Sequence, residues 1–422
     1  MNTPPSYSPS IPVAFDQRVL GTRDLFSLWF SLGLGLMVLQ TGALLAILLG
    51  TGVGVLLLGS AAMIGSDTGL AAMASLKLSL GSAGAALPAL LNLLQLVGWG
   101  AFEIIVMRDA ASLLVARGLG GDSLLTSPTL WTLVFGALAT LLAVAGPLAF
   151  VRRILRRWGI WLLLGACIWL TWDLLNRADL SALMARAGDG SMSFALGFDI
   201  AIAMPLSWLP LIADYSRFGR RGGGVFAGVA LGFFIGCLWL MGLGVAYTLA
   251  FAEGSDANAL LLALAGAGMG IPLLLILLDE SEKAFADIHS AAVSIGILLP
   301  LKVGQLALAI GAICTLIAWF APLAEYQNFL LLIGSVFAPL FGVVLVDHFI
   351  LRRRRAELAP RVALRWDTLL AWGFGVALYH LLANHWPEVG ATLPALLAAG
   401  TLQFLLGRFS RVRGNTGASV LR

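Results

Sequence analysis

The chain has 422 residues, of which 59% are hydrophobic and 11% are charged, and its mean hydropathy is +0.94. Soluble domains carry roughly 25% charged residues, so a soluble fold of this length could not cover its surface with those available here. The composition therefore excludes a soluble enzyme, a secreted disulfide scaffold and a nucleic-acid-binding domain, and the net charge of +4 does not indicate a nucleic-acid partner.

Long apolar runs without the alternation of barrel strands predict an all-α polytopic membrane protein. One span requires about 20 apolar residues. We expect no cleaved signal peptide because residues 1–22 contain no apolar run. Twelve transmembrane spans are predicted at roughly 25–48, 51–66, 85–113, 128–150, 158–176, 194–218, 223–252, 268–298, 303–321, 327–350, 366–385 and 391–407.

The positions of the basic residues support this count. All but five of the 26 Lys and Arg residues fall in segments that lie on the side of the N-terminus when the twelve spans alternate. The positive-inside rule then predicts an inner-membrane protein with cytoplasmic tails at 1–24 and 408–422. The five exceptions are Arg108, Arg117, Arg177, Arg186 and Lys283.

Polar residues interrupt the first and third spans. Gln40 lies in a glycine-rich part of the first span, where close helix packing is the alternative to a binding role. In the third span, Asn92, Gln95, Trp99 and Glu103 recur at steps of three or four residues and share one helical face. A single Glu could merely hydrogen-bond a neighbouring helix, but a Trp one turn before it favours a ligand-binding face.

The sixth span contains Pro205 and Pro210 on either side of Ser207 and Trp208. Proline removes a backbone donor and breaks a helix, and broken backbone inside a membrane lines a cavity or is buried in protein. A simple kink is the alternative. Interruptions in spans one and six are typical of inverted-repeat transporters with a binding site at the midplane. Asp199, nearer the outer end, is a further candidate contact.

The strongest interruption is the charged stretch 279–290 of the eighth span. Asp279, Lys283 and Asp287 are spaced by four residues, so the lysine can bridge a carboxylate one turn away on each side. A charge at mid-bilayer costs about 2.5–3.5 kcal/mol, so this face must contact protein or water. The alternative is an extramembrane loop over residues 272–289. The predicted ion-coupling residues are Asp279, Ser281, Glu282 and Lys283.

Three stretches of the sequence resemble the nucleobase:cation symporter family. They cover residues 65–103, 28–45 and 207–218, the last reading Ser-Trp-Leu-Pro-Leu-Ile-Ala-Asp-Tyr-Ser-Arg-Phe. The similarity is greatest to its CytX-like branch of hydroxymethylpyrimidine transporters. This resemblance implies a LeuT-type 5+5 inverted repeat, with repeats at 25–176 and 194–350 and two additional helices within 366–407.

The resemblance also implies roles for individual residues. In the family, the span 3 tryptophan stacks on the planar base and a residue one turn later hydrogen-bonds it, and these positions match Trp99 and Glu103. A substrate-binding asparagine of span 8 matches Asp287. The span 6 aromatic residue of the family falls near Pro205, and Trp208 is a possible substitute. The family's sodium-binding hydroxyls match Ser281 and Glu282.

These residues together predict a cation symporter that imports a planar pyrimidine. A carboxylate at Glu103 accepts hydrogen bonds only, which favours a 4-aminopyrimidine: the thiamine precursor 4-amino-5-hydroxymethyl-2-methylpyrimidine first, and cytosine next. Lys283 beside carboxylates favours protons over sodium as the coupling cation. We expect no cofactor or metal. The predicted substrate-binding residues are Gln40, Asn92, Trp99, Glu103, Ser207, Trp208 and Asp287.

Other functions stay open at the level of sequence. A permease for purines or allantoin, or a LeuT-type transporter of another small solute, would share the same architecture. A polytopic enzyme would need a His/Asp or metal cluster near one interface, and only His380 and His385 lie near one another in the sequence. A channel is disfavoured because no pore-lining ring of charges or filter motif is present.

Overall fold

A computed structural model describes residues 8–33, 44–119, 123–146, 159–185, 193–251, 271–320, 326–352 and 362–418. Within these ranges the regular structure is helical, apart from one isolated bridge between Leu20 and Gly219. The expected all-α class is therefore confirmed for the described part of the chain.

The principal helices are named by their residues, and each predicted span overlaps at least one of them. They are α1 (Thr22–Gly33), α3 (Leu44–Thr68), α4 (Ala72–Ser75), α5 (Lys77–Leu80), α6 (Ala86–Leu119), α7 (Pro128–Ala145), α9 (Ile160–Arg177), α10 (Leu180–Met184), α11 (Phe194–Ser207), α12 (Ile212–Ser216), α13 (Gly222–Phe251), α15 (Ile271–Ile295), α16 (Val303–Phe320), α17 (Tyr326–Leu345) with the π-helical η6 (Val346–Ile350), α18 (Trp366–His385) and α19 (Thr392–Ala418).

Among the described helices, seven are long and apolar enough to cross a bilayer. They cover 45–68, 86–116, 128–145, 194–216, 222–251, 303–320 and 329–350. Helix α15 carries five charged residues and is not one of the seven. The membrane location is thus supported by composition and length, while the count of twelve spans and the orientation of the termini stay predictions.

Two predicted boundaries were misplaced. Helix α3 begins at Leu44, inside the predicted first span of 25–48, because the apolar run continues across the junction and no charged residue marks it. At the other end, α19 continues to Ala418, beyond the predicted span end at 407, so part of the expected C-terminal tail is helical.

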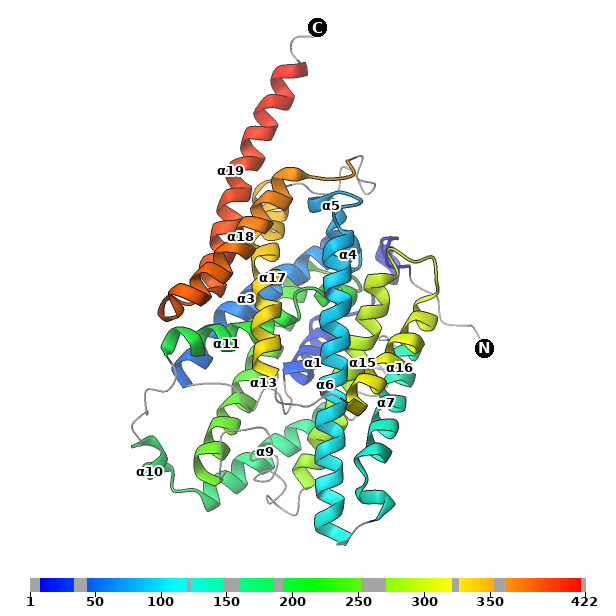
Figure 1. Ribbon diagram of the computed structural model, residues 1–422, viewed down its shortest axis with the longest axis vertical. Helices are drawn as coiled ribbons and strands as arrows, with labels where there is room; N and C mark the ends of the chain where they lie inside the picture. Colours follow the sequence, from blue (N-terminus) through cyan, green and yellow to red (C-terminus); the bar gives the residue numbers. More distant parts are fainter. Residues whose placement is uncertain are drawn as a thin grey trace.

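The helices pack as three groups (Figure 1). In the first group, α1 packs against α13, α13 against α3, and α3 against α11. Helices α6, α7, α15 and α16 form a second group. Helices α17, α18 and α19 form a third, in which α19 extends past the other helices (Figure 1). The first group joins predicted spans 1 and 2 to spans 6 and 7, and the second joins spans 3 and 4 to spans 8 and 9. This pairing is the one that two inverted repeats would produce.

A short N-terminal segment ties two helix ends together. The Val13 amide donates to Gly69 O at 2.9 Å, and the Leu20 amide donates to Phe218 O at 2.9 Å. Arg18 also donates to the Val13 carbonyl at 3.2 Å. Residues predicted to form a tail therefore cross from the end of α3 to the segment after α12. Gly69 has φ +71°, a conformation that favours glycine.

Helices α1 and α13 approach through glycine. A Cβ atom added at Gly232 would lie 2.5 Å from the backbone oxygen of Phe26, so no side chain fits there without separating the helices. Small residues at four-residue spacing allow this kind of close backbone packing in membranes. The glycines of α13 that face the α1 backbone are Gly228, Gly232 and Gly236.

We therefore expect Gly232→Ala to lower thermal stability, because a methyl group forced into a packed helix contact costs about 1–3 kcal/mol. Gly242→Ala on the same helix is the matched control, since nothing lies within 4 Å of a Cβ atom at that position. Thermal unfolding of both variants in detergent measures the difference. Equal stability of the two variants would show that this glycine contact is unimportant.

Candidate functional site

The break predicted in the sixth span is present. Helix α11 ends at Ser207, α12 begins at Ile212, and a turn joins them. Pro210 has no amide hydrogen. The Ile212 amide donates to Trp208 O at 2.9 Å and the Asp214 amide donates to Leu211 O at 3.0 Å. The carbonyls of Ser207 and Pro210 are consequently released from the helical hydrogen-bond pattern.

Two amide side chains of α6 bind these released carbonyls. Asn92 Nδ2 donates to Pro210 O at 3.2 Å, and Gln95 Nε2 donates to Ser207 O at 3.1 Å. The Gln95 amide also donates to Asn92 Oδ1 at 3.0 Å, and Asn92 donates to Ser294 Oγ of α15 at 2.8 Å. Asn92 and Gln95, on the polar face predicted for the third span, thus hold the broken helix against α6. Asn92 also links α6 to α15. The Ser207 hydroxyl donates to Met204 O at 2.7 Å.

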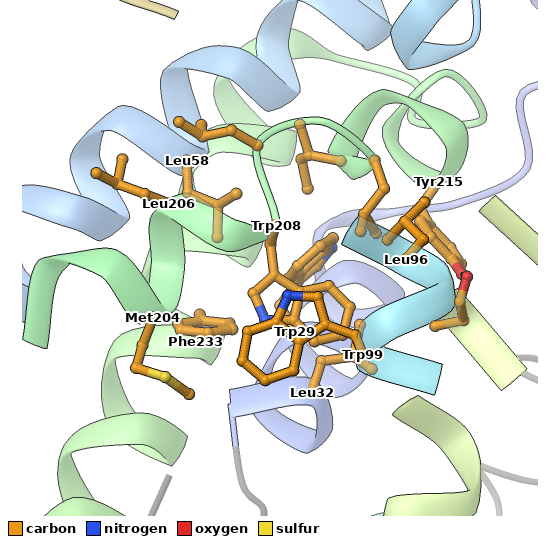
Figure 2. Packing of buried hydrophobic residues seen from close by; sticks show 14 of the residues in the cluster. Trp29, Leu32, Leu58, Leu96, Trp99, Met204, Leu206, Trp208, Tyr215 and Phe233 are labelled. Carbon is orange, nitrogen blue, oxygen red and sulfur yellow. The ribbon is translucent and has the colours of Figure 1, made fainter. Parts of the chain in front are cut away.

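Aromatic side chains surround this break. Figure 2 shows Trp29, Trp99 and Trp208 in one buried cluster with Tyr215 and Phe233. The Trp208 ring meets Trp29 edge-on, with centroids 5.6 Å apart and planes at 88°. Edge-to-face pairing is a favourable aromatic geometry, so the two rings hold one another in place. Trp208, in the turn between α11 and α12, therefore packs against α1.

Trp99 packs against Phe329 of α17. The two ring centroids lie 5.5 Å apart with planes at 68°. Trp99 itself is 6% exposed. Its neighbours Gly98 and Gly100 allow close packing, because a Cβ atom at Gly98 would collide with the Phe329 ring and one at Gly100 would lie 3.1 Å from Cys314 Sγ. The indole is consequently positioned by side chains from several helices.

The charged stretch of the eighth span is buried within the protein. Every residue from Glu280 to Ile295 of α15 is buried, and α15 packs directly against α6, α7, α9 and α16. The alternative of a loop over 272–289 is wrong for the described residues from 271 onward, which form one helix. These charges face other helices, which removes the penalty of exposing them to lipid.

Lys283 forms an ion pair with a carboxylate that the predicted bridge did not include. Its Nζ atom lies 3.5 Å from Glu280 Oε2, one turn before it on α15. We predicted a bridge between Asp279 and Asp287. On a helix, residues three and four positions away are both neighbours, so spacing alone could not identify the partner. The side chain of Asp279 lies outside the described part of the structure, and Asp287 lies within the electrostatic field of Lys283.

Glu103 brings a second acid into this cluster from α6. Its carboxyl group is hydrogen-bonded to that of Glu280, and Lys283 and Asp287 act on it electrostatically. Two carboxyl groups can share a hydrogen bond only when one of them carries a proton. Glu103 is 4% exposed, and its Oε2 atom has no hydrogen-bond partner. The site therefore contains a buried acceptor beside a second carboxyl group.

The remaining predicted coupling residues contact α1 and α6. Ser31 of α1 donates to Glu282 Oε2 at 2.6 Å, so a carboxylate joins the first and eighth predicted spans. Ser281 Oγ lies 3.2 Å from the Met107 sulfur and 3.5 Å from Leu277 O. Carboxylate, hydroxyl and ammonium groups thus fill the contact between these helices.

Of the two remaining candidates, Asp199 has a structural role and Gln40 is not described by the structure. The Asp199 carboxylate accepts hydrogen bonds from the amides of Ala391 at 2.6 Å and Thr392 at 3.2 Å, and so caps the N-terminus of α19. This is the usual role of aspartate at a helix N-terminus. Gln40 lies outside the described residues.

Sequence reasoning did not single out Trp29 or Ser31, and it did not assign Glu280 to the site. Trp29 lies beside Trp208 and Tyr215, with ring centroids 5.6 and 6.2 Å away. No local pattern reveals such contacts, because they join residues far apart in the chain. Only the charge of Glu280 within an apolar run was a usable signal.

Comparison with known proteins gives a consistent result. A family described as permeases for cytosine/purines, uracil, thiamine and allantoin matches residues 12–407 of this chain. The cytosine permease of Escherichia coli strain K12 is 26% identical over 394 residues, covering 90% of this chain and 88% of that protein. The cytosine permease of Escherichia coli O157:H7 is equally similar, at 26% identity over 394 residues.

Solved structures share the fold. The structure of Mhp1, a nucleobase-cation-symport-1 family transporter in a closed conformation with bromovinylhydantoin bound, matches with a TM-score of 0.77 and 19% identity over 95% of each chain. Inward-facing Mhp1 also gives a TM-score of 0.77, at 18% identity, covering 98% of this chain and 96% of that one. A sodium-coupled sialic acid symporter gives 0.63 at 11% identity, covering 92% and 88%. The expected LeuT-type fold is confirmed, while the 5+5 repeat stays a prediction.

Proposed function

Because this chain belongs to the family of permeases for cytosine/purines, uracil, thiamine and allantoin, we propose that it imports a planar aminopyrimidine by alternating access, coupled to protons. The family membership makes the protein a multi-pass membrane transporter and not an enzyme, as the sequence predicts. The substrate, the coupling ion, the inner-membrane location and the cytoplasmic termini belong to the proposal.

The observation that carries this proposal is the pairing of Trp99 with Glu103 on one face of α6. An indole ring binds the flat face of any heteroaromatic base, so stacking alone does not choose among bases. Glu103 Oε2 is a buried acceptor without a hydrogen-bond partner, one turn after that ring. An ionised carboxylate there favours a substrate that offers an exocyclic amino group. Hydroxymethylpyrimidine and cytosine both meet this requirement.

Proton coupling is supported by the composition of the buried cluster. Three acids, Glu103, Glu280 and Asp287, interact electrostatically with one lysine, Lys283. A fourth acid, Glu282, precedes Lys283 in the chain, and all five side chains are buried. Four ionised acids around one ammonium group would leave buried negative charge uncompensated, so the cluster must hold protons. We propose that the proton shared by Glu103 and Glu280 moves to Glu280 when the substrate's amino group binds Glu103. It leaves for the cytoplasm when the site opens inward.

Uptake by the purified protein in proteoliposomes tests the proposed function. We expect hydroxymethylpyrimidine and cytosine to accumulate under an inward proton gradient, with the same rate in sodium and potassium buffers. Competition by uracil, adenine, allantoin and amino acids defines the substrate class. Strict sodium dependence would contradict proton coupling, and uptake of an amino acid alone would contradict the proposed substrate class.

Replacing Glu103 by Gln is expected to relax substrate choice. The amide keeps an acceptor but adds a donor, so it can pair with the carbonyl groups of uracil as well as with an amino group. We expect the preference for aminopyrimidines over uracil to fall by about 10-fold, since one hydrogen bond to a charged group contributes about 1.5–3 kcal/mol. Competition for radiolabelled cytosine uptake measures the ratio.

Glu388→Gln is the control, because this glutamate is exposed in the segment between α18 and α19. It should leave the ratio at its wild-type value. An unchanged ratio in Glu103→Gln would remove the argument for an aminopyrimidine.

A further inference from the structure

The hydrogen bonds around Gln95 fix the direction in which its amide points. Ser207 O and Pro210 O are backbone carbonyls, which only accept hydrogen bonds. The NH₂ groups of Gln95 and Asn92 must therefore face them, at 3.1 and 3.2 Å. Asn92 Oδ1 then faces Gln95 and accepts its second hydrogen bond at 3.0 Å. The Gln95 amide cannot be reversed without placing two acceptors against each other.

This arrangement leaves the Gln95 carbonyl oxygen without a partner. Both amide hydrogens of Gln95 are used, whereas its Oε1 atom is buried and accepts no hydrogen bond. The residue is 3% exposed, so bulk water does not satisfy this oxygen. Buried polar atoms without partners are rare in folded proteins, and a bound ligand is one physical explanation for them.

The position of Gln95 points to the same ligand as Glu103. Gln95, Trp99 and Glu103 follow at four-residue steps on α6, so the two unpartnered acceptors lie one turn before and one turn after the indole ring. Their Cα atoms are about 12 Å apart along the helix axis, from a rise of about 1.5 Å per residue. A base stacked on Trp99 would have one acceptor at each of two opposite edges.

We propose that Gln95 Oε1 is a second substrate acceptor that selects a heterocycle with hydrogen-bond donors on two opposite edges. This inference rests on the proposed function and narrows its substrate class. The exocyclic amino group binds Glu103, and a ring N–H on the far edge binds Gln95. Cytosine has this pattern. Hydroxymethylpyrimidine carries its amino and hydroxymethyl donors on neighbouring carbons, so the geometry favours a cytosine-like ring.

Binding of two ligands by calorimetry tests the proposal. Cytosine carries the ring N–H, and 4-aminopyrimidine has a bare ring nitrogen at that position while keeping the amino group for Glu103. We expect the wild-type protein to bind cytosine about 10- to 100-fold more tightly, because a lone pair facing the fixed Gln95 oxygen leaves that acceptor unpaired. Equal affinity for the two ligands would overturn the proposal without any variant.

A Gln95→Met variant removes the acceptor with little change of shape. Because the variant also loses the donors to Ser207 O and Asn92 Oδ1, its affinity for both ligands is expected to fall. The loss should be much larger for cytosine than for 4-aminopyrimidine, so that the preference for cytosine falls to within about 3-fold. Gln95→Lys serves as a second variant, since an ammonium group keeps donors for Ser207 O and Asn92 Oδ1 but accepts nothing. A wild-type preference in a variant that still binds 4-aminopyrimidine would contradict the role of Gln95.

Ser294→Ala is the matched control. Ser294 accepts from Asn92 at 2.8 Å and belongs to the same hydrogen-bond network, but it offers no acceptor beside Trp99. We expect the control to keep the full preference for cytosine. An equal loss of preference in this control would assign the effect to the network as a whole and overturn the proposal. Failure of the wild type to bind any aminopyrimidine would instead refute the proposed function, and this inference with it.

Discussion

Trp99→Ala is expected to lower substrate affinity by about 10- to 100-fold and to abolish uptake at micromolar substrate. Stacking of a base on an aromatic side chain contributes about 1–3 kcal/mol by alanine substitution, which corresponds to this range. The loss should affect every base, because the face of the ring is common to all of them. Calorimetric titration with cytosine and with uracil measures the loss of affinity for each base.

Two further variants distinguish a ring that stacks on the substrate from one that only packs in the core. Trp99→Phe keeps an aromatic face and should retain most of the affinity. Trp161→Ala is the control, because Trp161 of α9 is 69% exposed and is expected to face lipid. If Trp99→Ala bound cytosine as tightly as the control, Trp99 would be a core residue and not a binding surface.

The structure also explains why this particular tryptophan is suited to the role. Trp161 is largely exposed, whereas Trp99 is buried and packs against Phe102 at 6.5 Å and Phe329 at 5.5 Å. Gly98 and Gly100 on either side of it permit the close approach of α16 and α17. A ring fixed in this way loses little further freedom when a base stacks on it, so more of the stacking energy is available for binding.

Local patterns in the sequence predicted the parts of the site that a single helix determines. Pro205 and Pro210 indicated the break between α11 and α12, because proline constrains the backbone wherever it stands. The spacing of Asn92, Trp99 and Glu103, by seven and then four residues, placed them on one face of α6. The charged run within an apolar segment predicted burial against protein, and α15 does pack directly against α6.

Contacts between distant segments could not be predicted in this way. The hydrogen bond between Ser31 and Glu282 joins residues 251 positions apart. The contact between the carboxyl groups of Glu103 and Glu280 likewise joins two different helices. The start of α3 at Leu44 was also missed, since hydrophobicity alone does not separate two helices joined by an apolar segment.

Glu280→Gln should uncouple transport from the proton gradient while leaving the substrate bound. Glutamine has the shape of glutamic acid and can donate to Glu103 as the protonated acid does, so the geometry beside Trp99 is kept. It cannot release a proton, so the step in which Glu280 becomes ionised beside Lys283, 3.5 Å away, is blocked. Accumulation under an inward proton gradient is expected to fall by at least 10-fold, whereas exchange of labelled for unlabelled cytosine continues.

Gradient-driven accumulation and substrate exchange are measured in the same proteoliposomes. Exchange requires substrate binding and alternating access but no net movement of protons, so it separates a coupling residue from one needed for folding. The control is Asp179→Asn, which alters an exposed carboxylate that caps α10. Because the Asp179 carboxylate accepts hydrogen bonds from Ser181 and Ala182, its pKa lies below the usual value, and it remains ionised in the assay. Gradient-driven accumulation by Glu280→Gln at the level of this control would exclude Glu280 as the proton carrier.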